Sequence, residues 1–379
     1  MKINGKGNPI AGIFVGFLFV IGGLILLWWN EGRTVKTEAA IKEAEQNYID
    51  VESSSVNKDN EGKLIASNGL QTRDEKLNDE LFGVMVDSSK MKRVVEVYQW
   101  VENCTSDSDN DETCTYDQRW EEDLIDSSKF KESVDHSNPK TMKYKGETFI
   151  ANKVKAGEYV VPEDLVRTLS TKEKVKLSTS NDDQRYAAYQ LGLSITQDGE
   201  YYTDVKANAP QIGDIRVSFE YNNEQYVSFM GVQKGNTIEP YKAKSGYKIY
   251  ELYEGQHNGE SMIQMMRDTN NTIKIICRIG GIILVIIGLL AIISPIQKLA
   301  SYVPILGTLF NGATTLIAIL LGLAISLIDI AIAWIVYRPI LGIGLLTVSV
   351  VLIILSFVLK KKNKKTVQQP VINQPINNN

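Results

Sequence analysis

The sequence contains few of the side chains from which metal centres and catalytic sites are usually built. Its 379 residues include two histidines and three cysteines, and none of these has the close spacing of a structural zinc site. The phosphate-binding, dinucleotide-binding, zinc-protease and serine-hydrolase motifs are all missing. We therefore predict no catalytic, cofactor-binding or metal-binding residues, and we predict that the protein is not an enzyme.

Acidic residues are almost absent from both ends of the chain. Of the 45 acidic residues, 43 lie between positions 37 and 272, and that stretch holds only 28 of the 41 basic residues. The two ends are therefore basic and apolar, while the middle is acidic. This distribution excludes a wholly globular cytosolic protein and indicates a membrane protein.

The first long stretch without charge runs from Gly7 to Asn30 and contains 24 residues. About twenty helical residues cross the roughly 30 Å hydrocarbon core of a bilayer. A cleaved signal peptide is the alternative, but cleavage needs small residues, whereas Trp28 and Trp29 end this stretch. We expect an uncleaved transmembrane helix over 10–29, after a short cytoplasmic N-terminus over 1–9.

Three further spans are predicted in the last quarter of the chain, over 275–293, 313–337 and 340–359. Residues 294–312 would connect the first two on the cytoplasmic side, and a re-entrant path is one alternative for them. Arg338-Pro339 predicts a tight turn. Lys2 and Lys6 before the first span, and five lysines after the last, indicate that both termini are cytoplasmic. The tail over 360–379 is expected to be basic and disordered, and to attract anionic lipid headgroups.

The region over 30–274 is expected to be a large non-cytoplasmic α+β domain with mainly antiparallel strands. Apolar residues alternate with polar ones over 189–195 and 215–221, which predicts half-buried strands. Asn222-Asn223 predicts a hairpin from the second of these into 225–233. Strands over 94–102 and 116–123 form another expected pair, and helices are expected over 34–46, 162–169 and 259–271.

Cys104 and Cys114 flank an acidic loop between the expected strands that carry Trp100 and Trp120. In an oxidising compartment the two thiols could form a disulfide, whereas in a reducing one they would stay free. Asp107, Asp109 and Asp111 have the spacing that opens a calcium loop, but the glycine and terminal glutamate of an EF-hand are missing. A hydrated loop is the favoured interpretation.

Two charged residues lie within the predicted spans. Asp329 shares one helix face with small residues of the third span, namely Ala318, Gly322, Ser326 and Ala333. Arg278 lies in the second span at a similar depth. We predict that Asp329 and Arg278 form a structural intramembrane pair; an ion or proton path is the alternative. Gly12 and Gly16 form a GxxxG motif that favours helix packing in the first span.

Several short stretches, in order along the chain, resemble the LUMA (transmembrane protein 43) family. They are Trp29-Asn30-Glu31-Gly32-Arg33, Tyr98-Gln99-Trp100-Val101-Glu102, His136-Ser137-Asn138-Pro139, residues 212–219, Arg278 with the glycines after it, and Trp334 with Tyr337-Arg338-Pro339. The resemblance implies a non-enzymatic membrane protein that self-associates and organises membrane protein complexes. It implies the endoplasmic reticulum and inner nuclear membrane for eukaryotic relatives, and the plasma membrane for bacterial ones.

Three functions are therefore weighed. The first is a scaffold whose partners are the lipid bilayer, other copies of the chain and other membrane proteins, with no nucleic acid. The second is a channel or transporter component that uses Asp329 and Arg278. The third is an enzyme that acts through His136 and the nearby Asp126 and Asp135, but no activated nucleophile accompanies them. We favour the scaffold.

Overall fold

The computed structural model describes residues 9–106, 112–203, 209–301, 307–337 and 339–366. The chain divides into two compact units. One is helical and comprises residues 1–43, 243–247 and 263–379, and the other is rich in strands and comprises residues 44–242 and 248–262. The result is an α+β membrane fold in which the strand-rich unit is inserted between the first and second long helices, as the charge distribution predicted.

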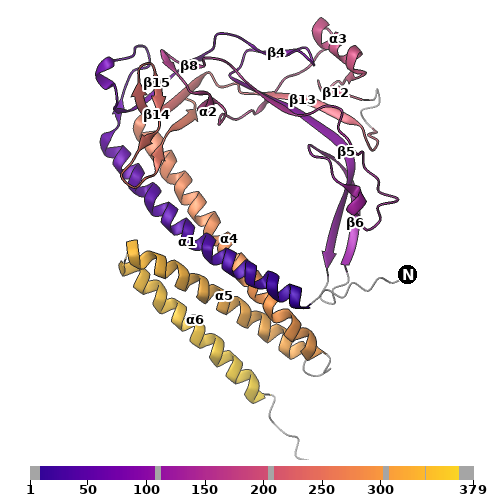
Figure 1. The fold of residues 1–379 in the computed structure, drawn as a ribbon, viewed down its shortest axis with the longest axis vertical. Helices are drawn as coiled ribbons and strands as arrows, with labels where there is room; N and C mark the ends of the chain where they lie inside the picture. Colours follow the sequence, from indigo (N-terminus) through magenta and orange to yellow (C-terminus); the bar gives the residue numbers. More distant parts are fainter. Residues whose placement is uncertain (1–8, 107–111, 204–208, 302–306, 338, 367–379) are drawn as a thin grey trace, which may run out of the picture. The chain divides into compact units, whose positions relative to one another are not determined.

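Four helices carry the apolar stretches, namely α1 (Pro9–Asn47), α4 (Gly259–Ser301), α5 (Gly307–Tyr337) and α6 (Pro339–Thr366). Within the described residues, three stretches are long and apolar enough to cross a membrane: Gly12–Asn47, Gly259–Ser294 and Thr314–Ile335. The apolar stretch of α6, Thr347–Val358, is shorter. Figure 1 shows α1 and α4 lying side by side, with α5 followed by α6.

The helices extend beyond the predicted spans. The expected helices over 34–46 and 259–271 are confirmed as continuations of α1 and α4. The connection over 294–312 is divided between α4, which continues through Pro295 to Ser301, and α5, which begins at Gly307. Residues 360–366, expected in a disordered tail, instead extend α6, because lysine is a good helix former and no breaker interrupts them. Arg338 and residues 367–379 lie outside the described residues.

Two seven-stranded sheets form most of the strand-rich unit. The first has the order β1 (Ile49–Asp50), β2 (Leu64–Thr72), β8 (Lys155–Ala156), β9 (Tyr159–Val160), β15 (Thr237–Glu239), β14 (Tyr226–Lys234) and β18 (Glu251–Glu254), and β14 also pairs with β2. Its pairings are antiparallel except for β1 with β2 and β15 with β9.

The second sheet has the order β11 (Ser194–Ile195), β12 (Tyr201–Tyr202), β13 (Ile215–Tyr221), β5 (Lys90–Ser106) and β6 (Glu112–Glu121), with β10 (Glu173–Lys174) on β13 and β7 (Glu147–Ile150) on β5. Two short hairpins are made by β3 (Leu77–Asp79) with β4 (Val84–Val86) and by β16 (Tyr241–Lys242) with β17 (Lys248–Ile249). Two short helices, α2 (Glu163–Val166) and α3 (Asp182–Leu191), complete the unit.

The core of this unit contains an aromatic cluster around Phe82, whose ring contacts those of Tyr144, Tyr201 and Phe219 at centroid distances of 5.4–5.7 Å. Arg93 of β5 lies over the Phe82 ring and forms an ion pair with the buried Asp79 at 2.5 Å. Burial raises the pKa of Asp79, although the Arg93 guanidinium acts in the opposite direction. Burial thus opposes the charge of Asp79, and Arg93 compensates for part of that cost.

Two of the predicted strand arrangements are wrong. Residues 215–221 and 226–234 are strands, but β13 and β14 belong to different sheets, so Asn222 does not turn a hairpin. Its amide donates to the Ser170 carbonyl and to the Glu254 carboxylate at 2.9 and 3.0 Å. These long-range hydrogen bonds fix the point at which the chain leaves one sheet for the other.

The second error concerns residues 189–195. Those up to Leu191 belong to α3, which is capped by the Asn181 side chain at its start and ends at Gly192 in the left-handed region. Only Ser194–Ile195 form a strand. Tyr189, which supplied part of the alternating pattern, is 81% exposed. By contrast, the predicted pairing of the two tryptophan strands is confirmed as β5 with β6, where Trp100 lies opposite Gln118 and Trp120 opposite Tyr98.

Candidate functional site

A buried ion pair joins α1 to α4 in the helical unit. Arg278 donates from Nε and Nη2 to the two carboxylate oxygens of Glu31, at 2.5 and 2.8 Å. The Glu31 side chain is only 2% exposed. The indole N–H of Trp334 on α5 donates to the same carboxylate, and the Arg278 guanidinium lies 4.9 Å from the centre of the Trp334 ring. A bidentate charged pair with a cation–π contact therefore connects three helices.

Polar side chains next to this ion pair are also paired between helices. The Asn30 amide donates to the Lys274 carbonyl at 3.1 Å, and Arg33 donates to the Asn270 side chain at 2.9 Å. Asn270, which is 2% exposed, donates in turn to the Thr34 carbonyl. We refer to Asn30, Glu31, Arg33, Asn270, Arg278 and Trp334 as the interhelical polar cluster. These hydrogen bonds offset part of the cost of burying polar groups in an apolar helix bundle, although Nε of Arg33 has no hydrogen-bond partner among the described residues.

The cluster corrects the predicted pairing of Arg278 with Asp329. Arg278 is already bound to Glu31, and Oδ2 of Asp329 is buried with no hydrogen-bond partner among the described residues. The prediction compared depths along the spans, and depth does not decide which helix face meets which. It also placed Glu31 outside the first span, whereas α1 continues as a helix through this residue.

Small residues bring the helices of this unit into close contact. A Cβ atom built on Gly16 or Gly23 of α1 would lie 2.7–2.8 Å from the carbonyl oxygen of Gly288 or Gly281 on the antiparallel α4. Gly12, the other half of the predicted GxxxG motif, has nothing within 4 Å. The glycines that pack are therefore seven residues apart on each helix, a spacing that a search for GxxxG does not detect.

The predicted stripe of α5 also lies against protein. Ala318 and Ser326 are fully buried, Ala333 is 2% exposed, and a Cβ atom on Gly322 would lie 2.7 Å from the Ile286 side chain of α4. The Ser326 hydroxyl has no hydrogen-bond partner among the described residues. Ser326 and Asp329 are three residues apart and so lie on one helix face. Two buried oxygen atoms without partners therefore lie on the same side of α5.

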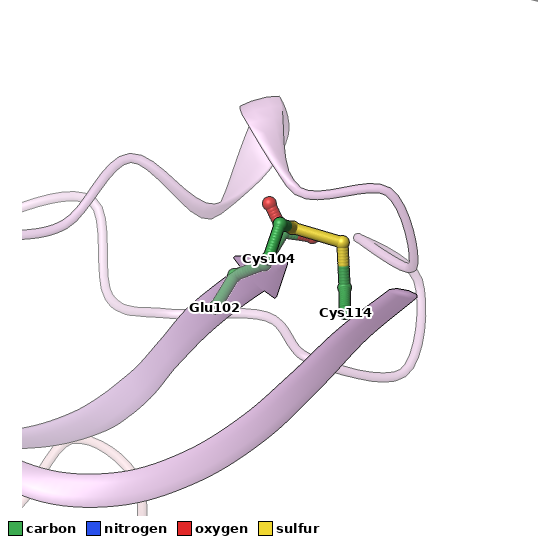
Figure 2. Close-up of side chains that lie close together, drawn as sticks. All are labelled: Glu102, Cys104 and Cys114. Atoms are coloured by element: carbon green, nitrogen blue, oxygen red, sulfur yellow. A yellow bond between two sulfur atoms is a disulfide. The ribbon is translucent and has the colours of Figure 1, made fainter. Parts of the chain in front are cut away.

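In the strand-rich unit, Cys104 of β5 and Cys114 of β6 lie opposite each other and are joined by a disulfide bond (Figure 2). With Glu102 they form the one group of metal-ligand type in the described part of the chain. The disulfide removes the thiolates that would bind a metal, and Glu102 accepts hydrogen bonds from the Tyr116 hydroxyl and the Lys131 amide. These residues therefore do not fit a metal ion. The predicted calcium residues, 107–111, lie outside the described residues.

The His136–Pro139 stretch packs against the same pair of strands. The Asn138 side chain accepts from the Trp100 amide at 2.7 Å and donates to the Trp100 carbonyl at 2.9 Å, so it pairs with β5 as a neighbouring strand would. His136 stacks on Tyr116 at 3.8 Å and meets Trp100 edge-on. No carboxylate in the described residues hydrogen-bonds to His136. This geometry describes packing and does not describe an acid–base dyad.

The comparisons with known proteins confirm the family that the short sequence stretches resemble. A family model for transmembrane protein 43 matches residues 97–339. Transmembrane protein 43 of mouse and of human are each 25% identical to the chain over 87% of its length and 85% of theirs. The Drosophila melanogaster transmembrane protein 43 homolog is 25% identical, over 89% of this chain and 91% of its own. No solved structure matches. Because the family model covers well over half of the sequence, the chain belongs to the transmembrane protein 43 family of integral membrane proteins.

Proposed function

We propose that this protein is a non-enzymatic multi-pass membrane protein that scaffolds membrane protein complexes. It self-associates, and its strand-rich unit binds other membrane proteins on the non-cytoplasmic side. The observation that carries this proposal is the Glu31–Arg278–Trp334 arrangement, in which the charged groups neutralise each other and join helices. Intramembrane charges that pair between helices in this way hold a helix bundle together.

The disulfide supports the proposed side of the membrane. Disulfide bonds persist in oxidising compartments and are rare in the cytosol, and Cys104 and Cys114 are bonded in the strand-rich unit. With basic residues at both ends of the chain, this favours cytoplasmic termini. The proposed location is the endoplasmic reticulum or inner nuclear membrane in a eukaryotic cell, and the plasma membrane in a bacterial one.

The orientation is tested by thiol labelling of sealed membrane vesicles with a membrane-impermeant maleimide. In a background that carries Cys277→Ser, we expect Ser180→Cys, an exposed position, to react only from the non-cytoplasmic side. Thr366→Cys, at the end of the lysine-rich helix, should react only from the cytoplasmic side and serves as the matched control. Labelling of Ser180→Cys from the cytoplasmic side would contradict the proposed orientation.

The scaffold role is tested by crosslinking in native membranes, followed by identification of the proteins that co-purify. We expect copies of the chain and other membrane proteins. Co-expression of two differently tagged copies gives an independent readout, because a self-associating chain carries the second tag through purification on the first. Recovery of the monomeric chain alone in both experiments would contradict the scaffold proposal.

A channel or transporter component is the second candidate, and the two unpartnered oxygens of Ser326 and Asp329 favour it. Purified protein in liposomes separates the two functions. On the scaffold proposal we expect no ion flux above that of empty liposomes, because Glu31 and Arg278 neutralise each other. Reproducible flux that Asp329→Asn abolishes, and that Ile332→Asn at an exposed position of α5 leaves unchanged, would instead favour the channel.

A further inference from the structure

Strand β6 is an edge of the second sheet. Its ten residues pair with β5 on one side, from Glu112 opposite Ser106 to Glu121 opposite Val97. No backbone group in the described residues hydrogen-bonds to its other side. A long unpaired strand edge is a template for strand pairing unless it is covered or blocked. The question is therefore which strand fits β6.

The direction of the free backbone groups follows from Asn138. Both backbone groups of Trp100 bond to the Asn138 side chain, on the edge of β5 that faces away from β6. Trp100 and Gln118 are opposite each other, so they form a pair without mutual hydrogen bonds, and the N–H and C=O of Gln118 point outward. The N–H and C=O groups of every second residue of β6, which include Tyr116 and Trp120, therefore point outward as well. The open edge of β6 therefore presents a regular row of donors and acceptors.

The side chains along this edge favour one antiparallel register with a second copy of β6. When the two-fold axis passes through Gln118, Asp117 lies opposite Arg119 of the other copy, and Tyr116 lies opposite Trp120. Each contact occurs twice because of the symmetry. An axis at Tyr116 would put Asp117 opposite Thr115, and one at Arg119 would put Asp117 opposite Glu121. Of these three registers, only the one at Gln118 pairs both opposite charges and aromatic rings, which are the pairs that stabilise adjacent strands. An axis at Trp120 would pair Arg119 with Glu121, but it would also put Asp117 opposite Asp123.

The polar residues at the centre of this register are accessible and not strongly engaged elsewhere, whereas the half-buried Tyr116 and Trp120 also pack within their own chain. Asp117, Gln118 and Arg119 are all exposed. Arg119 lies 3.5 Å from Glu121 with both side chains more than a third exposed, a geometry that contributes little to stability. Asp117 accepts a hydrogen bond from the exposed Asn103. The disulfide between Cys104 and Cys114 joins β6 covalently to β5 near the first residue of β6.

We propose that two copies of this protein associate through their β6 strands, antiparallel and centred on Gln118, so that the second sheets of the two copies form one continuous sheet. This inference rests on the self-association in the proposed function and names the surface responsible. Two charge pairs and the outward backbone groups supply the specificity of the contact.

The first test is a charge swap in the full-length protein, measured as co-purification of two tagged copies in mild detergent. Asp117→Arg and Arg119→Asp should each weaken association by roughly tenfold, because each puts like charges opposite one another twice. The double variant Asp117→Arg with Arg119→Asp restores opposite charges and should recover most of the association. Two weakened single variants without recovery in the double variant would overturn the register, as would single variants that associate normally.

The second test is disulfide crosslinking at the two-fold axis. In the Cys277→Ser background, Gln118→Cys should form a dimer on mild oxidation, because paired residues in adjacent strands have Cα atoms about 5.5 Å apart, within the range of a disulfide. Thr115→Cys is the matched control, since the register places it far from its own copy. Equal crosslinking of the two variants, or none at Gln118→Cys, would overturn the proposal. If tagged copies still co-purify in that case, self-association stands and uses another surface; if they do not, the self-association in the proposed function fails as well.

Discussion

Replacing Glu31 with glutamine is expected to destabilise the helical unit by about 3–5 kcal/mol, the usual cost of removing one partner of a buried ion pair. Glutamine keeps the size of the side chain and can still accept a hydrogen bond from Trp334, but it leaves the Arg278 guanidinium without a counter-charge. Thermal unfolding of the purified protein in detergent, together with the yield of monodisperse protein, measures the effect.

Two further variants make this prediction specific. Asp329→Asn changes an acidic residue that makes no ion pair with Arg278, so it should leave thermal stability nearly unchanged. The exchange Glu31→Arg with Arg278→Glu restores opposite charges and should recover part of the loss. If Glu31→Gln is as stable as the parent protein while Asp329→Asn is not, then Arg278 is neutralised by Asp329, and the interhelical polar cluster described above is wrong.

Replacing Gly23 with leucine is expected to separate α1 from α4. A Cβ atom at this position would lie 2.8 Å from the Gly281 carbonyl oxygen and 2.8 Å from the Val285 side chain. Because the first of these atoms belongs to the backbone, no rotamer change can make room, and the helices must move apart. Overpacking of this kind costs about 1–3 kcal/mol. Thermal unfolding is one readout. The other is the yield of crosslinking between cysteines introduced at Leu27 and Gly281, which should fall when the two helices move apart.

The neighbouring glycine provides the control, since a Cβ atom on Gly22 has nothing within 4 Å. Gly22→Leu should therefore be tolerated, and leucine has a higher helix propensity than glycine. The same contrast separates Gly16, where an added Cβ atom would lie 2.7 Å from the Gly288 carbonyl oxygen, from Gly12, where it would have nothing within 4 Å. Equal destabilisation by Gly22→Leu and Gly23→Leu would show that the effect comes from the loss of glycine and not from contact with α4.

Local sequence patterns predicted where the strands lie better than they predicted which strands pair. The tryptophan strands were predicted as a pair because a short acidic loop joins them, and adjacent strands with a short connection usually pair. The same reasoning failed for β13 and β14, where two asparagines separate two strands that belong to different sheets. Asn222 makes its hydrogen bonds to Ser170 and Glu254, residues distant in sequence that no local pattern identifies.

In the candidate site too, the sequence identified an important residue but not its partner. Arg278 was identified because a charge within an apolar span needs a partner, but the choice of Asp329 used depth alone. The sequence identified Glu31 only as part of a family motif and not as an ion-pair partner. In the structure its carboxylate accepts hydrogen bonds from both Arg278 and Trp334. Two signals pointed to the correct arrangement: the seven-residue spacing of glycines on both helices, and an acidic residue directly after the first apolar stretch.

The sequence by itself determined that this is a membrane protein with one apolar helix before, and further apolar helices after, a large mixed α+β region. Hydropathy and charge are properties of consecutive residues, so they can be read along the chain. Only the tertiary structure decided which charge neutralises which, which glycines allow close packing, and which sheet each strand joins. Those outcomes depend on helix rotation and strand register, which are set by the simultaneous packing of residues that lie far apart in sequence.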